Sequence, residues 1–189
     1  MSTDAKTSMP VEGNNPMNFL FIAGMQVAFT GVMAGVVKHT PVLRVLDDAL
    51  PFSTPNIAMC WIIMLAGLIQ GWLGATTNWA RKEYNVPWPW TFAQPSNKNK
   101  LKFDMVQRAH LNFVENYTQV LGVSYFAAQV SSNLAAVCGS FFLLGRLAFI
   151  RGYYTGNAKN KDSGAFGYIL GFFPLVGLAW YYLISNLLL

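Results

Sequence analysis

The stretch NYTQVLGVSYFAAQVSSNLAAVCGSFFLLG, residues 116–145, contains 30 consecutive residues without a charge. A helix needs about 20 apolar residues to cross the ~30 Å hydrocarbon core of a bilayer, so this run is too long for one span and too short for two. The polar triplet Ser131-Ser132-Asn133 interrupts the run and is typical of a turn. The sequence therefore predicts two helices, at 105–129 and 133–151, joined by a tight turn.

Three further apolar runs flank this helical hairpin. Residues 17–37 carry no charge for 21 positions, and residues 49–80 are also uncharged, although two early prolines place the start of that helix near Asn56. A last helix is predicted at 165–188. The 17–37 run is longer than the apolar core of a signal peptide and no small-residue cleavage site follows it, so we expect it to be a retained transmembrane helix.

The overall composition is that of a membrane protein. Of the 189 residues, 53% are hydrophobic and only 11% are charged, against about 25% charged residues in soluble domains. Thirteen Lys and Arg against eight Asp and Glu give a net charge of +5, and long uncharged runs confine these charges to a few loops. This segregation indicates a lipid bilayer as the partner and argues against nucleic acid. The two cysteines and two histidines lie far apart in sequence, so no metal site is expected.

The distribution of basic residues predicts an orientation. Five spans place the N-terminus, the 81–104 loop and the 152–164 loop on one side, which carries eleven Lys and Arg residues against two on the other side. The positive-inside rule then directs the N-terminus and the basic loops to the cytosol or the mitochondrial matrix. The predicted order is a polar tail, an extra transmembrane helix, a connecting loop and a four-helix membrane domain, at 1–16, 17–38, 39–56 and 57–189.

One face of the predicted 105–129 helix carries candidate binding residues. Arg108, Asn112 and Glu115 follow one another at spacings of four and three, which places them on the same side of a helix. Ionisable groups inside a span usually mark a functional site. Arginine grips a carboxylate, asparagine donates and accepts, and glutamate binds an ammonium group, so this face suits a zwitterionic, peptide-like ligand. The alternative is that Arg108 and Glu115 neutralise each other, or that Glu115 pairs with Arg146 across helices.

A second polar cluster lies at the end of the predicted 133–151 helix. Arg146, Phe149 and Tyr153 share a face there, at spacings of three and four. Tyrosines in this position are suited to hydrogen bonding with a ligand, and equally to an aromatic belt at the membrane surface.

Several longer segments occur together in a fixed order: NWARKEYNVPWPWTF at 78–92, FDMVQRAHLNFVENY at 103–117, GRLAFIRGYYTG at 145–156 and GAFG at 164–167. With this order and spacing the chain resembles the MAPEG family, the membrane-associated proteins in eicosanoid and glutathione metabolism, and is most similar to the type-three microsomal glutathione transferases. The resemblance covers residues 57–185. It implies an all-α integral membrane fold, with a four-helix MAPEG-like bundle to which this chain adds one N-terminal transmembrane helix.

The resemblance also implies the partners and the site. Members of the family form homotrimers that bind glutathione, a co-substrate, between protomers. The residues carried over to glutathione binding are Arg108, Asn112, Glu115, Gln107 and His110 on one helix, and Arg146 and Tyr153 on the next. The implied chemistry is activation of the glutathione thiol as a thiolate, which a nearby cation favours. Tyr153 and Lys161 are the catalytic candidates.

The chain departs from the family pattern at several places. Phe149 stands where close relatives have a tyrosine, and Thr118 stands where a proline commonly follows the glutamate motif. The activating arginine of the family is missing, and only lysines such as Lys161 remain near its place, without the planar fork of arginine. The 17–37 helix and the 39–56 loop have no counterpart in the four-helix pattern.

Two functions follow from these observations. The first is a glutathione transferase or peroxidase that acts on lipophilic electrophiles or lipid hydroperoxides in the endoplasmic reticulum or a mitochondrial membrane. The alternative is a catalytically degenerate accessory subunit of a larger membrane assembly, such as a mitochondrial respiratory complex, which the extra helix, Phe149 and the missing arginine favour. A transporter is not favoured, because the sequence shows no internal repeat.

Overall fold

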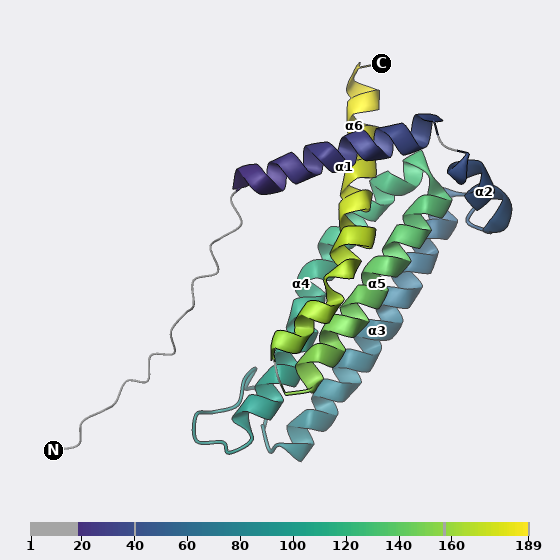
Figure 1. Ribbon diagram of the computed structural model, residues 1–189. Helices are drawn as coiled ribbons and strands as arrows, with labels where there is room; N and C mark the ends of the chain where they lie inside the picture. The colour runs from purple at the N-terminus through teal and green to yellow at the C-terminus, as the bar shows by residue number, and fades with distance from the viewer. Residues whose placement is uncertain (1–18, 40, 157, 189) are drawn as a thin grey trace.

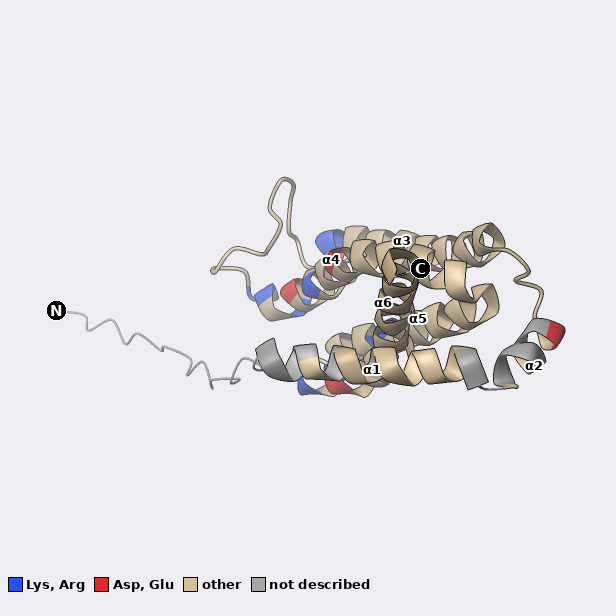
Figure 2. Ribbon diagram, turned by 90° about the horizontal axis from the view of Figure 1, so that it is seen from above, with Lys and Arg blue, Asp and Glu red and all other residues tan. Residues whose placement is uncertain are grey.

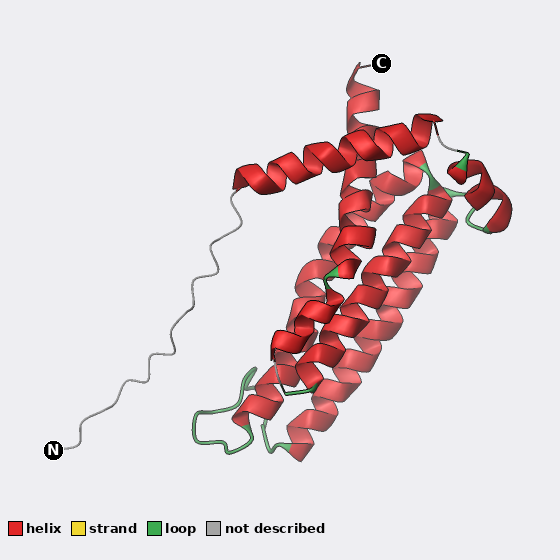
Figure 3. Ribbon diagram, viewed as in Figure 1, coloured by secondary structure: helices red, strands yellow, loops and turns green. Residues whose placement is uncertain are grey.

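The computed structural model describes residues 19–39, 41–156 and 158–188. The regular secondary structure of these residues is helical throughout (Figure 3). Its elements in chain order are α1 (Phe19–His39), α2 (Val42–Ala49), α3 (Pro55–Glu83), α4 (Lys100–Val130), α5 (Ser132–Tyr154), the 3-10 segment η1 (Ala158–Gly164), the π-helical segment η2 (Tyr168–Phe172) and α6 (Phe173–Leu188).

Helices α3 to α6 form an antiparallel bundle (Figure 1). Contacts join α3 to α4 and α5, and α4 to α5 and α6. The α3–α4 loop and the η1 connection lie at the same end of the bundle, as the sequence predicts, and the described Lys and Arg residues concentrate toward that end (Figure 2). This end is called the basic end below. The C-terminus and α2 lie at the opposite end (Figure 1).

Local capping sets the helix boundaries. The predicted turn between the two central helices is confirmed: Ser131 is extended, with φ −153° and ψ 110°, and its hydroxyl accepts a hydrogen bond from Leu134 N. At the start of α3, Thr54 Oγ1 accepts a hydrogen bond from Ile57 N, and Pro55 occupies the first turn, where a missing N–H costs nothing.

The surface of the bundle is apolar as well as its interior. In α3, Ile62, Ala66 and Leu73 are fully buried, yet Met64 and Leu68 on the outer side are 67% and 71% exposed. A helix that is apolar all round belongs in lipid. Among the described residues, three helical segments are long and apolar enough to span a membrane, at 55–83, 132–154 and 159–188. The chain is therefore a multi-pass membrane protein.

The N-terminal elements lie outside the bundle. Helix α1 contacts α6, but it runs across the bundle instead of alongside the long helices (Figures 1 and 2). That α1 crosses the membrane stays a prediction, and the predicted polar tail at 1–16 lies outside the described residues. The prediction of a loop at 39–56 is wrong for part of this segment, which contains α2. The signal for this helix is present in the sequence, because apolar residues at 42, 43, 45 and 46 share one face of a helix while the charged residues lie on the other.

Glycines allow α5 and the η2 segment to touch through their backbones. A Cβ atom on Gly145 would lie 2.4 Å from Gly167 Cα, and one on Gly171 would lie 2.5 Å from Phe142 N. Both distances are far shorter than any ordinary van der Waals contact. Only glycine fits at these positions, and the close approach brings residues 168–172 against α5.

Replacing Gly145 by alanine tests this contact. The added Cβ meets backbone atoms that cannot rotate away, so Gly145→Ala is expected to destabilise the protein by about 1–3 kcal/mol. The matched control is Gly122→Ala in α4, where a Cβ meets nothing within 4 Å and helix propensity predicts stabilisation of up to about 1 kcal/mol. Thermal unfolding in detergent measures both. Equal melting temperatures for the two variants would contradict the close packing.

Candidate functional site

A buried hydrogen-bond network links α4, α5 and η2. The guanidinium of Arg146 is 2% exposed and donates to Asn112 Oδ1 and, at 3.4 Å, to the Tyr168 hydroxyl. The Tyr168 hydroxyl in turn donates to Asn116 Oδ1 at 2.7 Å. Asn116 Nδ2 donates to the Asn112 carbonyl at 2.7 Å, which closes the cycle. These four residues are called the Arg146 network below.

The charge of Arg146 has no carboxylate partner among the described residues. Within them, the one salt bridge joins Lys100 and Asp104 on a different part of α4. A buried charge is costly unless it is paired or hydrogen-bonded, and the partners of Arg146 are an amide and a phenol. The alternative of an ion pair between Arg146 and Glu115 is therefore not observed in this part of the chain. The bundle holds an uncompensated positive charge.

Phe149 contributes to holding this charge. Its ring centroid lies 4.2 Å from Arg146 Cζ, a distance at which the negative face of an aromatic ring attracts a cation. Phenylalanine cannot donate a hydrogen bond, but it supplies this stabilisation as a tyrosine would. The departure from the family pattern at this position thus leaves the support of Arg146 in place.

The three residues of the predicted face on α4 differ in solvent exposure. Asn112 is half-buried, whereas Arg108 and Glu115 on either side are exposed. Because Asn112 Oδ1 accepts from Arg146, its amide nitrogen remains to donate to a ligand. Arg108 places its Cζ 5.5 Å from the ring centroid of Phe92, in the loop between α3 and α4. This face therefore offers a cation, an amide donor and a carboxylate in a row.

Two of the predicted residues on α4, His110 and Gln107, form no hydrogen bond with the Arg146 network. His110 contacts α3, where its Nε2 lies 3.0 Å from Gln70 Nε2 and its Nδ1 lies 3.4 Å from Thr77 Oγ1. Gln107 is buried, and its Oε1 atom has no hydrogen-bond partner among the described residues. Neither residue joins the Arg146 network.

The two catalytic candidates lie close together at the basic end. Segment η1 folds back on the last turns of α5, where a Cβ on Gly152 would lie 2.4 Å from Asn160 O and 2.5 Å from Lys161 N. The backbone of Lys161 therefore lies next to the residue that precedes Tyr153. Tyr153 is half-buried, and its ring centroid lies 5.1 Å from that of Phe149. Phe149 thus bridges Tyr153 and Arg146.

Tyr168, Asn116 and Gln70 were not predicted as site residues. Tyr168 directly follows the GAFG segment, but its role depends on the π-helical turn that rotates it toward α5, and such a turn has no clear sequence signal. Asn116 lies one turn after Asn112, so helical spacing alone would have placed it beside the predicted face. Among the described residues no group of three or more His, Cys, Asp or Glu is placed to hold a metal ion.

A comparison with protein families identifies the family of this bundle. The model of the MAPEG family matches residues 58–184, about two thirds of the chain. The match includes most of α3 and α6, all of α4 and α5, and all four residues of the Arg146 network, and it leaves out α1 and α2. The chain therefore belongs to the MAPEG family and is a glutathione-related, multi-pass membrane protein.

Proposed function

We propose that the protein binds glutathione on the α4 face formed by Arg108, Asn112 and Glu115, with Arg146 and Tyr153 contributing from α5. In this proposal it is a transferase or peroxidase for lipophilic electrophiles or lipid hydroperoxides, like the type-three microsomal glutathione transferases. The observation that carries the proposal is the buried charge of Arg146, which has only neutral partners among the described residues.

The charges of glutathione complement this face. The tripeptide carries two carboxylates and one ammonium group at neutral pH. Arg108 suits one carboxylate and Glu115 suits the ammonium group, while the amide nitrogen of Asn112 donates to a further oxygen. Arg146 does not contact solvent, so its contribution is indirect: it orients Asn112 and adds a positive potential that favours an anionic ligand. Arg146 is thus a positioning residue.

The chemistry follows from the thiol of the bound tripeptide. A cation and a hydrogen-bond donor near the sulfur favour its thiolate, the nucleophilic form. In our proposal Lys161 supplies the charge and the Tyr153 hydroxyl donates the hydrogen bond. In conjugation, the thiolate forms an S–C bond with the electrophile as the leaving group departs with its electron pair. In peroxide reduction, two glutathione molecules give a disulfide, and the hydroperoxide becomes an alcohol and water.

Removing the exposed arginine tests glutathione binding. Arg108→Ala is expected to raise the Kd for glutathione about 10-fold or more, because a charge-assisted hydrogen bond contributes about 1.5–3 kcal/mol. The control is Lys102→Ala, which removes another exposed cation from α4 and should leave the Kd unchanged. Isothermal titration calorimetry of the full chain in detergent gives both values. Wild-type affinity in an Arg108→Ala, Glu115→Ala double variant would disprove the site.

Removing the loop lysine tests thiol activation. Since a cation lowers the pKa of a nearby thiol, Lys161→Ala should raise the pKa of the bound glutathione thiol. The pH–rate profile for conjugation would then shift to higher pH, so the rate falls at neutral pH and recovers in alkaline buffer. Arg151→Ala, which removes an exposed cation near the end of α5, should leave the profile in place. A uniform loss of rate at every pH would argue against a role of Lys161 in activation.

The position of α1 favours a second candidate, an accessory subunit of a larger membrane assembly. Helix α1 covers part of α6 (Figure 1) and lies outside the region shared with the family. In this role α1 or α2 would contact unrelated subunits, whereas the enzyme is proposed to be a homotrimer with its basic end toward the cytosol or the matrix.

Native purification distinguishes the two roles. If the protein is the enzyme, gentle extraction from its own membrane followed by native mass spectrometry should give a species of three identical chains that retains glutathione. Stoichiometric co-purification of unrelated membrane subunits, with no glutathione bound, would favour the accessory role instead.

A further inference from the structure

The loop between α3 and α4, residues 84–99, is fixed by side chains that bond to its backbone. Arg81 in the last turn of α3 is buried, and its Nη1 donates to the Trp90 carbonyl at 2.7 Å. The same guanidinium lies over the ring of Trp88, with 4.0 Å from Cζ to the ring centroid. Arg81 thereby positions two tryptophans of the loop.

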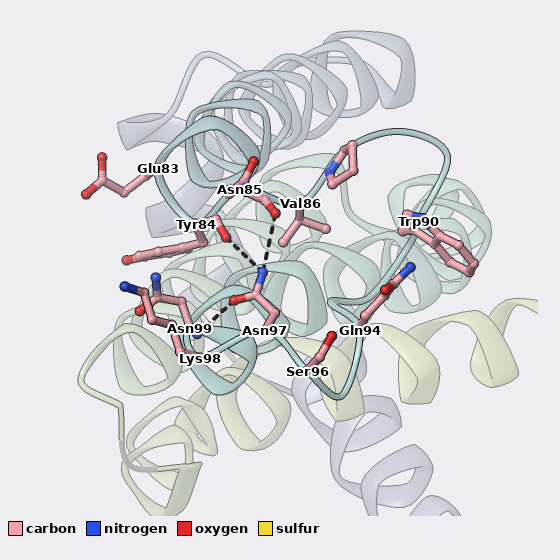
Figure 4. A pocket seen from close by; sticks show the side chains of 11 residues that line it. Glu83, Tyr84, Asn85, Val86, Trp90, Gln94, Ser96, Asn97, Lys98 and Asn99 are labelled. Carbon is pink, nitrogen blue, oxygen red and sulfur yellow. Dashed lines mark hydrogen bonds between the residues drawn. The ribbon is translucent and has the colours of Figure 1, made fainter.

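A second set of bonds closes the other half of the loop. Asn97 Nδ2 donates to the carbonyls of Tyr84 and Asn85, at 2.9 Å and 3.3 Å (Figure 4). Lys100 Nζ donates to the Ala93 carbonyl at 2.9 Å. The loop is therefore a folded element that presents its outer side chains in set positions.

Three tryptophans on and beside this loop are exposed. Trp79, Trp88 and Trp90 are 57%, 70% and 49% exposed. Large rings held in water by a folded loop are unfavourable, but at a bilayer surface the ring meets apolar groups while its N–H stays hydrated. The membrane-spanning candidate α3 ends at Glu83, one residue before the loop. If α3 spans the membrane, the loop is placed at the level of the lipid headgroups.

Two hollows flank the loop and differ in charge. The first has a volume of about 570 Å³ and is lined by Trp90 together with Glu83 and Lys98, whose charges are opposite (Figure 4). The second has a volume of about 510 Å³ and lies beside Trp88. Its lining contains two cations, Arg81 and Lys82, and no carboxylate.

The second hollow has the functional groups that a phosphate requires. Lys82 is exposed and forms no ion pair with any described residue, whereas the guanidinium of Arg81 is already engaged by Trp88 and Trp90. Asn78 and Asn85 add amide groups to the lining. A free cation, amide donors and an exposed aromatic ring therefore meet in one place at the membrane surface.

We propose that the hollow beside Trp88 binds the headgroup of an anionic phospholipid from the surrounding bilayer. Lys82 pairs with the negative charge, Asn78 and Asn85 donate to the phosphate oxygens, and the Trp88 ring packs on the upper part of the acyl chains. Free phosphate would satisfy the cation, but it would leave the rings of Trp79 and Trp88 in water, so the occupant is a lipid. This site is separate from the proposed glutathione face.

Fluorescence quenching by brominated lipids tests the proposal. The full chain is reconstituted in two sets of vesicles of identical charge, each an equimolar mixture of phosphatidylcholine and phosphatidylserine. In one set only phosphatidylserine is brominated, near the glycerol end of its acyl chains, and in the other set only phosphatidylcholine is brominated. The signal of Trp88 is the difference between the wild-type protein and Trp88→Phe.

Trp88 should be quenched more strongly by brominated phosphatidylserine, with an enrichment of about fivefold, the effect of one lysine near an anionic surface. Lys82→Gln should make the two lipids equivalent. Lys98→Gln is the matched control: it removes a lysine of the loop that lines the neutral hollow, and it should retain the preference. Thermal unfolding verifies that both variants are folded.

Three results would overturn the proposal. The first is equal quenching of wild-type Trp88 by the two lipids, and the second is a preference that survives Lys82→Gln. The third is loss of the preference when inorganic phosphate replaces chloride at the same ionic strength, which would identify the hollow as a site for free anions.

Discussion

The guanidinium of Arg146 lies inside the bundle with an amide, a phenol and an aromatic face as its described partners. A hydrogen bond to a charged group contributes about 1.5–3 kcal/mol, so each hydrogen-bond partner is constrained in position. Asn112 belongs to α4, Arg146 and Phe149 belong to α5, and Tyr168 precedes α6. A single charge thus fixes three segments relative to one another and orients the amide that faces the proposed ligand.

Close backbone packing at glycines brings the residues of the Arg146 network together. Tyr168 reaches Arg146 because Gly145 and Gly167 allow α5 and the chain at the start of η2 to approach within contact of their backbones. The close approach continues within η2, where a Cβ on Gly171 would lie 2.5 Å from Phe142 N. At the basic end, Gly152 permits η1 to fold back so that the backbone of Lys161 lies against Gly152, the residue before Tyr153. The glycines of α5 are therefore part of how the site is built, although they offer no functional group to a ligand.

The sequence predicts the helices of the bundle well, because charge-free runs and turn residues are local signals. The turn at Ser131 and the helix start near Asn56 lie within a residue or so of the observed boundaries. That Asn112 and Arg146 belong to one site is implied only by the family resemblance, and the structure places the two side chains in hydrogen-bond contact. The role of Tyr168, the engagement of His110 with α3 and the stacking of Arg146 on Phe149 depend on which helix faces which. Helical spacing orders residues around one helix and carries no information on that choice. The crosswise position of α1 could not be predicted from the sequence either, because its uniformly apolar residues mark no preferred face.

A double-mutant cycle tests most directly whether Arg146 acts on the ligand through Asn112. The glutathione Kd is measured for wild-type protein, Arg146→Met, Asn112→Ala and the double variant, with thermal unfolding as the check on folding. If Arg146 orients Asn112, then Arg146→Met weakens binding in the wild-type background and has little further effect once Asn112 is alanine. Two effects that add within about 0.5 kcal/mol, or an Arg146→Met variant that is folded and binds glutathione normally, would contradict this account of the site.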